Sequence, residues 1–413
     1  MTPTLTLTVL FWRALLGIAV FGLFCSFVFL LLVLVAAARF KIRADADRVS
    51  CFNLVGDLPP VTIFKPVHGM EERLEENLAS FFQQNYPDFE IILGARSAGD
   101  PAVGLAEKVR LRYPQVKSRI VISGAPTWPN AKVFTLSKMI PLARNDFFVI
   151  SDSDVRVGSD FLRNVIPPLL SEHSGSQQIG LVTCLYRGDP AADFWSLLEA
   201  LGMSVEMPSG VVVADMLEGI RFALGPAVAV RRDALEAIGG IAATADYYSD
   251  DYVLGNKIWA AGYKVIFSHY FVHHVLTPRT FFRTLGDQLR WMKSTRHSRP
   301  WGHLGTGLTF GVPFGVLGFI AAAALGNLRL AFALLAIAFL NRLVQSLAVG
   351  WGLLRDPRAL RLCWLYPLRD FQGFLVWAAS YFSREFYWRG EIYRFAAGGK
   401  IIARDREAED AGR

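Results

Sequence analysis

The sequence predicts an α/β domain with a mostly parallel sheet, flanked by transmembrane helices towards both ends of the chain. Three observations support this prediction. Long apolar stretches lie near the two ends, and 53% of the 413 residues are hydrophobic while only 19% are charged. Short strands and helices alternate between these stretches, and one apolar strand runs directly into two aspartates. An uneven apolar excess of this kind is typical of a membrane protein with a polar domain between its spans.

The first element is a predicted transmembrane helix and its basic flank, residues 1–43. Residues 15–38 contain no charged side chain and are numerous enough to cross a bilayer. The alternative is a cleaved signal peptide, but its apolar core would be shorter. Arg39, Lys41 and Arg43 follow this stretch, whereas Arg13 alone precedes it. The positive-inside rule therefore places the middle of the chain in the cytoplasm, at the bacterial inner membrane or, in a eukaryote, at the Golgi membrane.

Residues 44–276 are expected to form a cytoplasmic α/β domain. Strands and helices alternate here with short links, an order that favours a mostly parallel sheet covered by helices. The apolar run 147–150 contains no polar residue, as expected of a strand buried on both faces. The other predicted strands are 61–65, 89–96, 119–123, 179–185 and 262–268, and the predicted helices are 71–84 and 101–112.

Residues 277–303 mix arginines with aromatic side chains, which is typical of a helix that lies in the lipid headgroup region. The formal net charge of +7 could also suit nucleic acid, but beside membrane spans we expect contact with anionic headgroups and no nucleic acid. The apolar helix predicted at 195–213 has two open interpretations: it borders a lipid entrance, or it is an ordinary core helix.

Residues 304–413 are expected to form a second membrane region. Stretches 304–325 and 330–354 are predicted spans, and Arg342 within the second should face protein or headgroups because a buried charge is costly in lipid. Residues 371–382 are apolar but short, which indicates a re-entrant or interfacial segment, followed by a basic tail.

Carboxylates follow two of the predicted strands. Asp152 and Asp154 come directly after the strand at 147–150, and Asp100 follows the strand at 89–96. Ligands of parallel sheets bind at the carboxyl ends of the strands, and paired carboxylates suit a divalent cation that also holds a diphosphate. The alternative for Asp152 and Asp154 is a solvated turn. Asp250 and Asp251 precede a predicted helix, where aspartate is also a common N-cap.

Together with these carboxylates, seven segments carry a resemblance to a known family. They are KPVHG (65–69), the run 85–102, NAK (130–132), SDSDVRV (151–157), SDDY (249–252), LRW (289–291) and YRFAAGG (393–399). Across nearly the whole chain the sequence resembles inverting nucleotide-sugar glycosyltransferases of the GT-A fold related to family 2. More narrowly, it resembles the ceramide glucosyltransferase group, glycosyltransferase family 21. The resemblance implies a Rossmann-like GT-A domain with membrane helices at both ends.

The resemblance implies a role for each matching residue on the donor side. The turn with Lys65, Pro66 and Gly69 would hold the uridine together with Asp100, which would contact the base. Lys132 would approach the phosphates. Asp152 would contact the nucleotide and, with Asp154, a divalent metal, either Mg²⁺ or Mn²⁺.

On the acceptor side, the resemblance implies that Asp251 is the general base. Arg290 and Trp291 would close over the diphosphate and the acceptor, with Asp250 and Gln288 nearby. Some positions depart from the family pattern: Asp287 stands where the family usually has Gln or Arg, and Gln288 is one residue off. Thr135 stands where Asn is frequent, and 203–208 lacks the histidine of eukaryotic members. These departures leave the sugar and the acceptor open.

The chemistry gives the same reading independently. Displacing a nucleoside diphosphate from a sugar requires a cation at the leaving group and a carboxylate base for the incoming hydroxyl. With this chemistry, the resemblance implies transfer of a sugar, with glucose favoured, from a UDP-sugar to the primary hydroxyl of a membrane lipid, giving a β-glycosylated sphingolipid if the lipid is ceramide. Alternative acceptors are a hopanoid or a diacylglycerol, with galactose or N-acetylglucosamine as the sugar. A processive polysaccharide synthase would need more spans, and a non-catalytic membrane scaffold would not need the intact set Asp100, Asp152, Asp154 and Asp251.

Overall fold

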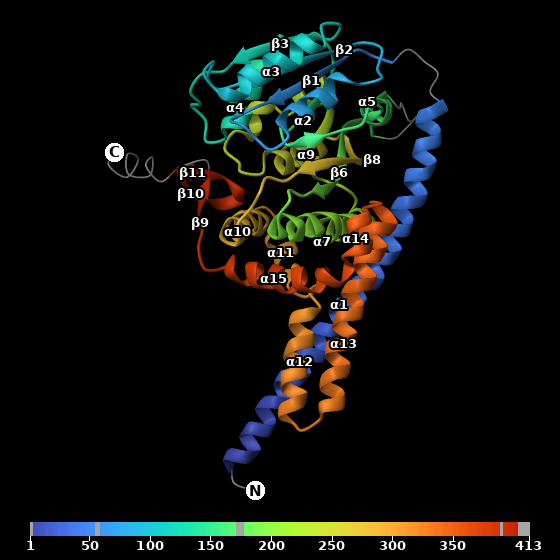
Figure 1. Cartoon of the computed structure of the whole chain (residues 1–413), viewed down its shortest axis with the longest axis vertical. Helices are drawn as coiled ribbons and strands as arrows, with labels where there is room; N and C mark the ends of the chain where they lie inside the picture. The colour runs from blue at the N-terminus through green and yellow to red at the C-terminus, as the bar shows by residue number, and fades with distance from the viewer. Residues whose placement is uncertain (1–2, 54–57, 171–176, 389–390, 404–413) are drawn as a thin grey trace, which may run out of the picture. The chain divides into compact units, whose positions relative to one another are not determined.

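The computed structural model describes residues 3–53, 58–170, 177–388 and 391–403 (Figure 1). These residues form two compact units that interleave along the chain. The helical unit comprises Met1–Phe40, Ala192–Leu217 and Arg279–Arg384. The sheet unit comprises Lys41–Ala191, Glu218–Pro278 and Glu385–Arg413. The division of the sequence at residues 43, 276 and 303 remains a prediction about segments, whereas the packing units combine pieces that are distant in sequence.

The sheet unit contains a mostly parallel mixed sheet, as predicted. Within the described residues its strand order is β3-β2-β1-β4-β7-β6-β8-β5. The first four strands are mutually parallel, β6 is parallel to β8, and β7 is antiparallel to both of its neighbours. The strands are β1 (Val61–Pro66), β2 (Phe89–Ala95), β3 (Lys117–Ile122), β4 (Phe147–Ser151), β5 (Val155–Arg156), β6 (Ile179–Asp189), β7 (Ala227–Arg231) and β8 (Lys264–Val275).

All six predicted strands are present, but β7 and the two-residue strand β5 were not predicted. β6 and β8 extend further than expected, to Asp189 and Val275. β7 lies between β4 and β6, and its apolar run, between Gly225-Pro226 and α8, is only five residues long. Its antiparallel insertion brings the segment just before Ala227 beside the end of β4, where Ser151 pairs with Ala227.

Helices cover this sheet because its central strands are apolar on both faces. Ile63, Ile91 and Val149 are fully buried in one core with side chains from the flanking helices. The helix predicted at 71–84 begins three residues later, after Arg73 in a left-handed conformation, φ 53°. The helices are α2 (Leu74–Phe82), α3 (Pro101–Arg112), α4 (Ala131–Met139), η1 (Ile140–Leu142), α5 (Phe161–Val165), α6 (Pro167–Leu170), α8 (Arg232–Ala237), η2 (Ile241–Thr244) and α9 (Asp250–Ala260).

A small antiparallel sheet near the C-terminus also belongs to the sheet unit. It contains β9 (Glu385–Trp388), β10 (Glu391–Phe395) and β11 (Ile401–Ala403), with the turn η5 (Ala397–Gly399) between the last two. Its aromatic residues form a cluster with Tyr248. The backbone N–H of Ile401 donates to the carbonyl of Asp246 at 2.8 Å, which ties this sheet to the segment that precedes α9.

The helical unit contains the membrane segments. Three helical stretches are long and apolar enough to cross a membrane: Leu7–Ala46, Phe194–Glu218 and Leu328–Leu353. The first and third include most of the spans predicted at 15–38 and 330–354. The span predicted at 304–325 is interrupted, and its apolar helix α12 has only 13 residues. Phe194–Glu218 was predicted as a helix without a membrane assignment, and 67% of its apolar window is buried.

The helices of this unit complete the list of elements. They are α1 (Pro3–Asn53), which continues past the boundary of the unit, α7 (Phe194–Glu218), α10 (Phe281–Ser298), α11 (Pro300–Thr306), α12 (Val312–Ala324), α13 (Leu328–Gln345), the π-helix η3 (Ser346–Leu353), α14 (Pro357–Arg361), η4 (Cys363–Leu365) and α15 (Tyr366–Ala379).

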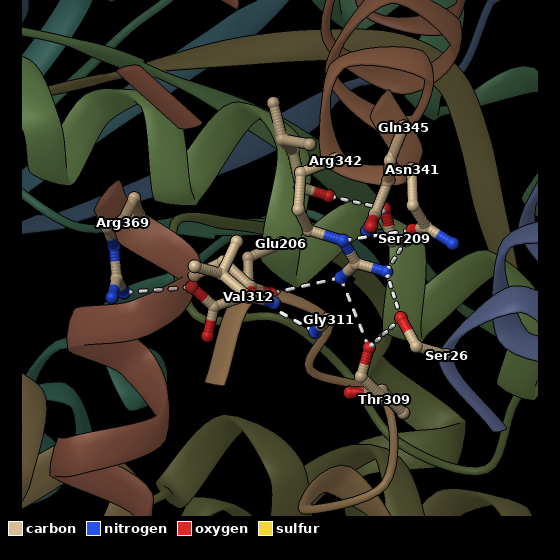
Figure 2. Close-up of polar contacts among 12 residues, drawn as sticks. Ser26, Glu206, Ser209, Thr309, Gly311, Val312, Asn341, Arg342, Gln345 and Arg369 are labelled. Atoms are coloured by element: carbon tan, nitrogen blue, oxygen red, sulfur yellow. Dashed lines mark hydrogen bonds and ion pairs between the residues drawn. The ribbon is translucent and has the colours of Figure 1, made fainter. Parts of the chain in front are cut away.

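Arg342 faces protein, as the cost of a charge in lipid predicts (Figure 2). Its Nη1 lies 3.0 Å from Oδ1 of Asp370, and its Nη2 donates to the Ser26 hydroxyl at 2.8 Å. The other oxygen of Asp370 accepts hydrogen bonds from the backbone N–H groups of Gly311 and Val312 at 3.0 and 2.8 Å. This network joins α1, α13 and α15 to the start of α12, so Arg342 serves the packing of the helical unit.

Candidate active site

Asp152 and Asp154 stand at the carboxyl end of β4, as the sequence analysis predicted. The backbone N–H of Asp152 donates to the carbonyl of Pro226 at 3.3 Å, because β7 pairs with the last residues of β4. The ammonium group of Lys65 donates to the carbonyl of Asp152 and lies 4.0 Å from the ring centre of Phe81. The buried Lys65 side chain thus stabilises the backbone of the segment that contains Asp152.

Lys65 is 0% exposed, and this burial lowers its pKa to about 7, although the charges of Asp152 and Asp154 oppose the shift. The sequence analysis assigned Lys65 and Pro66 to uridine binding. The Lys65 side chain contacts the backbone of Asp152, and its role in uridine binding stays a prediction.

Asn130 connects α4 to the start of α9. Its side-chain oxygen caps α4 by accepting hydrogen bonds from the N–H groups of Lys132 and Val133 at 3.1 and 3.2 Å. Its amide nitrogen donates to the Tyr247 carbonyl at 2.9 Å and to Oδ1 of Asp250 at 3.3 Å. The Asn-Ala-Lys segment therefore places Lys132 beside the acidic pair at the start of α9.

Lys132 bridges two of the predicted carboxylates. Its Nζ lies 2.7 Å from Oδ1 of Asp152 and 3.3 Å from Oδ2 of Asp250. Burial alone would lower the pKa of Lys132, but the two carboxylates raise it above its ordinary value. Lys132 therefore stays charged and offsets the repulsion between the carboxylates of Asp152 and Asp250, which are far apart in the sequence.

Asp251 approaches the same place from α9. A Cβ atom at Gly225 would lie 3.0 Å from Oδ2 of Asp251 and 3.7 Å from Oδ2 of Asp152, so the absence of a side chain at Gly225 leaves room for both. Burial, with the neighbouring charge of Asp250, raises the pKa of Asp251 to about 7. A carboxylate whose pKa lies near the working pH is suited to act as a general base.

Asp154 lies beside a histidine that the sequence analysis did not identify. Nε2 of His274, on β8, is 3.4 Å from Oδ2 of Asp154, and the N–H of Val275 donates to the Asp154 carbonyl at 2.7 Å. Oδ1 of Asp154 is buried and has no hydrogen-bond partner among the described residues. Burial, with the nearby charge of Asp154, also raises the pKa of Glu71 to about 7.

These residues fit a divalent cation. No group of three His, Cys, Asp or Glu side chains in the described part of the chain could hold a metal by itself. Mg²⁺ is commonly bound by one or two carboxylates together with waters and substrate phosphates. The free oxygen of Asp154 supplies such a carboxylate, and the imidazole of His274 beside it is a softer ligand that suits Mn²⁺ better than Mg²⁺.

Asp100 stabilises the turn that follows β1. Its Oδ1 accepts hydrogen bonds from the N–H groups of Gly69 and Ala102, both at 2.9 Å, and its Oδ2 lies 3.0 Å from Nδ1 of His68. These bonds lower the pKa of Asp100 although burial opposes the shift. Gly69 has a φ of 66°, a conformation that favours glycine. Asp100 is therefore joined by hydrogen bonds to the turn that was predicted to bind uridine.

Tyr248 anchors the segment that leads into Asp250 and Asp251. Its ring centre lies 5.1 to 5.8 Å from those of three aromatic residues on the small C-terminal sheet, Phe386, Trp388 and Phe395. The pairs are edge-on, which is a favourable geometry for aromatic rings. The C-terminal strands thus support the position of the acidic pair.

The remaining predicted residues, Gln288, Arg290 and Trp291, lie on α10 in the helical unit. Asp287, the departure from the family pattern, forms an ion pair with Arg279 and accepts from Nη1 of Arg290 at 2.9 Å. The carboxylate of Asp287 therefore orients Arg290 through an ion pair, which a Gln or Arg at this position could not form.

The structure brings Lys132, Asp152, Asp250 and Asp251 together, and it joins Gly69 to Asp100. The sequence analysis missed His274, Gly225, Glu71 and Tyr248. The Gly-Pro pair before β7 was a signal for Gly225, since glycine in such a place often permits close approach. His274 carried no signal, because its pairing with Asp154 depends on the register of β5 against β8.

Comparisons with known proteins identify the family of the chain. The family described as glycosyl transferase family 21 matches residues 22–401. Ceramide glucosyltransferase 1 of Caenorhabditis elegans is 25% identical over 242 residues, which is 57% of this chain and 50% of that protein. Ceramide glucosyltransferase 3 of the same organism is 24% identical over 357 residues, 84% of this chain and 74% of that protein. The aligned part of the chain thus spans about half of the first relative's length.

Among solved structures, a mannosyltransferase from Pyrobaculum calidifontis in complex with GDP-Man and Mn²⁺ is 18% identical, with a TM-score of 0.47 over 83% of this chain and 99% of that one. The family match covers most of the chain and includes every candidate site residue described above. The chain belongs to glycosyl transferase family 21.

Proposed function

We propose that this chain is a membrane-bound inverting glycosyltransferase that transfers glucose from UDP-glucose to the primary hydroxyl of a ceramide-like lipid. The observation that carries this proposal is that Asp251 and Asp152 both approach Gly225, while Asp154, two residues after Asp152, lies beside His274. An inverting displacement needs a cation at the leaving diphosphate and a general base at the incoming hydroxyl. The ceramide glucosyltransferases among the relatives support the choice of donor and acceptor.

The donor side holds the nucleotide and the diphosphate. The Gly69 turn, fixed by Asp100, would bind the uridine, and Asp152 would contact the nucleotide. Asp154 and His274 would hold Mg²⁺ or Mn²⁺, which supplies neutralisation of the negative charge on the departing diphosphate. Lys132 adds a fixed positive charge beside Asp152, and Arg290 with Trp291 would close over the diphosphate.

The acceptor side removes one proton. Asp251 would take the proton of the lipid hydroxyl as its oxygen forms a bond to the sugar C1 and the bond from C1 to the UDP oxygen breaks. Because attack and departure occur on opposite faces, an α-linked donor gives a β-linked product. Asp250 is engaged by Lys132 and Asn130, which supports Asp251 as the base.

The position in the membrane is part of the proposal. The three apolar helical stretches support a membrane protein, and the basic residues Arg39, Lys41 and Arg43 support a cytoplasmic sheet unit. A protease-sensitive tag in the exposed turn between α3 and β3 is expected to be protected in sealed right-side-out vesicles. Cleavage of that tag from outside intact cells would overturn the orientation.

The proposal is tested by incubating the purified protein with a mixture of UDP-sugars and lipids and identifying the products by mass spectrometry. We expect a hexosylceramide formed from UDP-glucose, with release of one UDP for each lipid glycosylated. A glycosylated hopanoid or diacylglycerol would correct the acceptor, and galactose or N-acetylglucosamine in the product would correct the donor. A complete lack of transfer and of UDP binding would indicate a membrane scaffold.

A further inference from the structure

Two buried amide side chains face each other within the helical unit, one on α10 and one on α15. Nε2 of Gln372 donates a hydrogen bond to Oε1 of Gln288 at 3.3 Å. Gln288 is 4% exposed and Gln372 is 8% exposed. Each amide therefore uses one of its polar atoms on the other, away from solvent.

The other polar atom of each amide is unmatched. Nε2 of Gln288 and Oε1 of Gln372 are buried and have no hydrogen-bond partner among the described residues. If both amides were turned over, the pair would still present one N–H₂ group and one carbonyl oxygen. Leaving a buried donor or acceptor unsatisfied costs about 1–3 kcal/mol, so such a pair suits a ligand that supplies the missing partners.

Thr284 extends this polar surface along α10. It lies four residues before Gln288, which places the two side chains on one face of the helix. Thr284 is 0% exposed, and its hydroxyl also lacks a partner in the described part of the chain.

Arg369 extends the surface along α15, three residues before Gln372. Its Nη2 lies 3.0 Å from Oε2 of Glu206 on α7 (Figure 2), whereas its Nε and Nη1 are buried without a hydrogen-bond partner among the described residues. A Cβ atom at Gly202 would lie 2.4 Å from Nε of Arg369, so the glycine makes room for the guanidinium. The polar surface therefore runs through three helices of an otherwise apolar unit.

We propose that the Gln288–Gln372 pair binds the secondary amide of a sphingolipid acceptor, an inference that rests on the proposed function. The free N–H of the pair donates to the amide carbonyl of the lipid, and the free carbonyl accepts from the amide N–H of the lipid. A secondary amide carries both groups, which point to opposite edges in its trans form, and the two free atoms of the pair likewise come from different helices. A diacylglycerol offers ester carbonyls but no N–H, and a hopanoid offers no amide, so either acceptor leaves the carbonyl of the pair unmatched.

This arrangement selects the acceptor by the amide N–H and not by the apolar chains. A site built to hydrogen-bond an N–H group discriminates strongly against an analogue that lacks it, because the polar group of the site is then left unpaired. One unmatched carbonyl corresponds to a preference of about ten- to a hundredfold for the amide lipid. Thr284 adds a hydroxyl next to the pair, suited to a hydroxyl of the same headgroup.

The test measures lipid binding, so that it does not depend on sugar transfer. A fluorescent short-chain ceramide is bound to the purified full chain in detergent and displaced by unlabelled competitors of equal chain length. The competitors are ceramide, its N-methyl derivative, and a matched lipid in which an ester replaces the amide. We expect ceramide to compete about ten- to a hundredfold better than the other two.

Gln372→Met removes the hydrogen-bonding groups with little change in volume and should bring the three competitors to within about threefold of one another. The matched control is Gln345→Met, since Gln345 is also buried in the helical unit, 1% exposed, and also has an Oε1 without a partner among the described residues, but it donates to Ser209 and is not paired with Gln288. The control should keep the parent's preference. UDP binding, measured on every variant, shows that the sheet unit is folded.

Equal competition by ceramide and the ester lipid in the parent would overturn the inference, and so would full preference retained in Gln372→Met. Loss of the preference in Gln345→Met as well would assign the effect to general packing and would also overturn it. The proposed function fails separately: a parent that prefers ceramide in binding but transfers no sugar to it would contradict the enzyme and leave the amide site standing.

Discussion

Lys132 and Asp152 form an ion pair in which Nζ lies 2.7 Å from Oδ1, and the same ammonium group reaches Asp250 at 3.3 Å. The lysine thus lies between the end of β4 and the start of α9. Three carboxylates, those of Asp152, Asp250 and Asp251, contribute to its electrostatic environment. The charge balance of the candidate site therefore depends on this side chain.

Replacing Lys132 with Met should remove transfer activity and lower stability. Without the ammonium group the partly buried acids repel one another, and loss of one partner from such a network costs about 3 kcal/mol. Transfer from UDP-glucose and the urea midpoint of unfolding are measured together. Lys108→Met, on an exposed position of α3, is the control and should change neither. Near-parent activity in Lys132→Met would contradict the bridging role.

Asp251→Asn should lower kcat about a hundred- to ten-thousandfold, because the amide keeps the shape but cannot accept the proton. UDP-glucose binding should remain near the parent's. Asp250→Asn should cost far less, since an amide oxygen can still accept from Asn130. UDP release and lipid product are followed separately with saturating lipid. An active Asp251→Asn beside an inactive Asp250→Asn would identify Asp250 as the base.

The pH dependence of transfer should show an acidic limb. The pKa of Asp251 is raised to about 7, and the base must be ionised, so kcat should rise as pH increases through about 7. The ionisation of Asp251 affects the free energy of unfolding in the opposite direction. Because the folded pKa exceeds the unfolded value of about 3.9, the folded state binds the proton more tightly, and stability is lost as pH rises from about 4 to about 7.

Asp251→Asn should therefore have a higher Tm than the parent at pH values above about 7, and a similar Tm near pH 4. Thermal unfolding in EDTA across this range measures the effect without a bound cation. An unchanged difference in Tm at every pH would contradict the raised pKa.

EDTA should abolish transfer, and added Mn²⁺ or Mg²⁺ should restore it. Asp154→Ala should lose metal-dependent UDP binding. His274→Ala should raise the metal concentration needed for half-maximal UDP binding about ten- to a hundredfold, because one ligand is gone while Asp154 remains. His273→Ala, the neighbouring position on β8, is the control, since His273 contacts Arg187 instead. Full activity of the parent in EDTA would rule out the cation site.

Tyr248→Ala should lower kcat about tenfold or more while UDP binding changes little. Loss of its contacts with Phe386, Trp388 and Phe395 loosens the segment that carries Asp250 and Asp251, and small displacements of catalytic groups are costly. Tyr387→Ala is the matched control, because that side chain is 67% exposed on β9. Equal losses in both variants would argue against a specific supporting role.

The sequence by itself determined the features that depend on local pattern. An uncharged apolar stretch is long enough for a membrane helix wherever it lies, and it appears as part of α1. Apolar runs such as Phe147–Ser151 form strands because they can bury both faces, and the aspartates that follow must then lie at the sheet edge. The resemblance also placed Asp152, Asp154 and Asp251 in one site before any packing was known.

Only the tertiary structure decided which distant residues meet. β7 is only a short apolar run in the sequence, yet its pairing with β4 brings Gly225 close to both Asp152 and Asp251. The pairing of Gln288 with Gln372 likewise depends on how two helices pack. Local periodicity reports which face of an element is apolar. It does not report the partner that this face meets, because that choice is made by the packing energy of the whole unit.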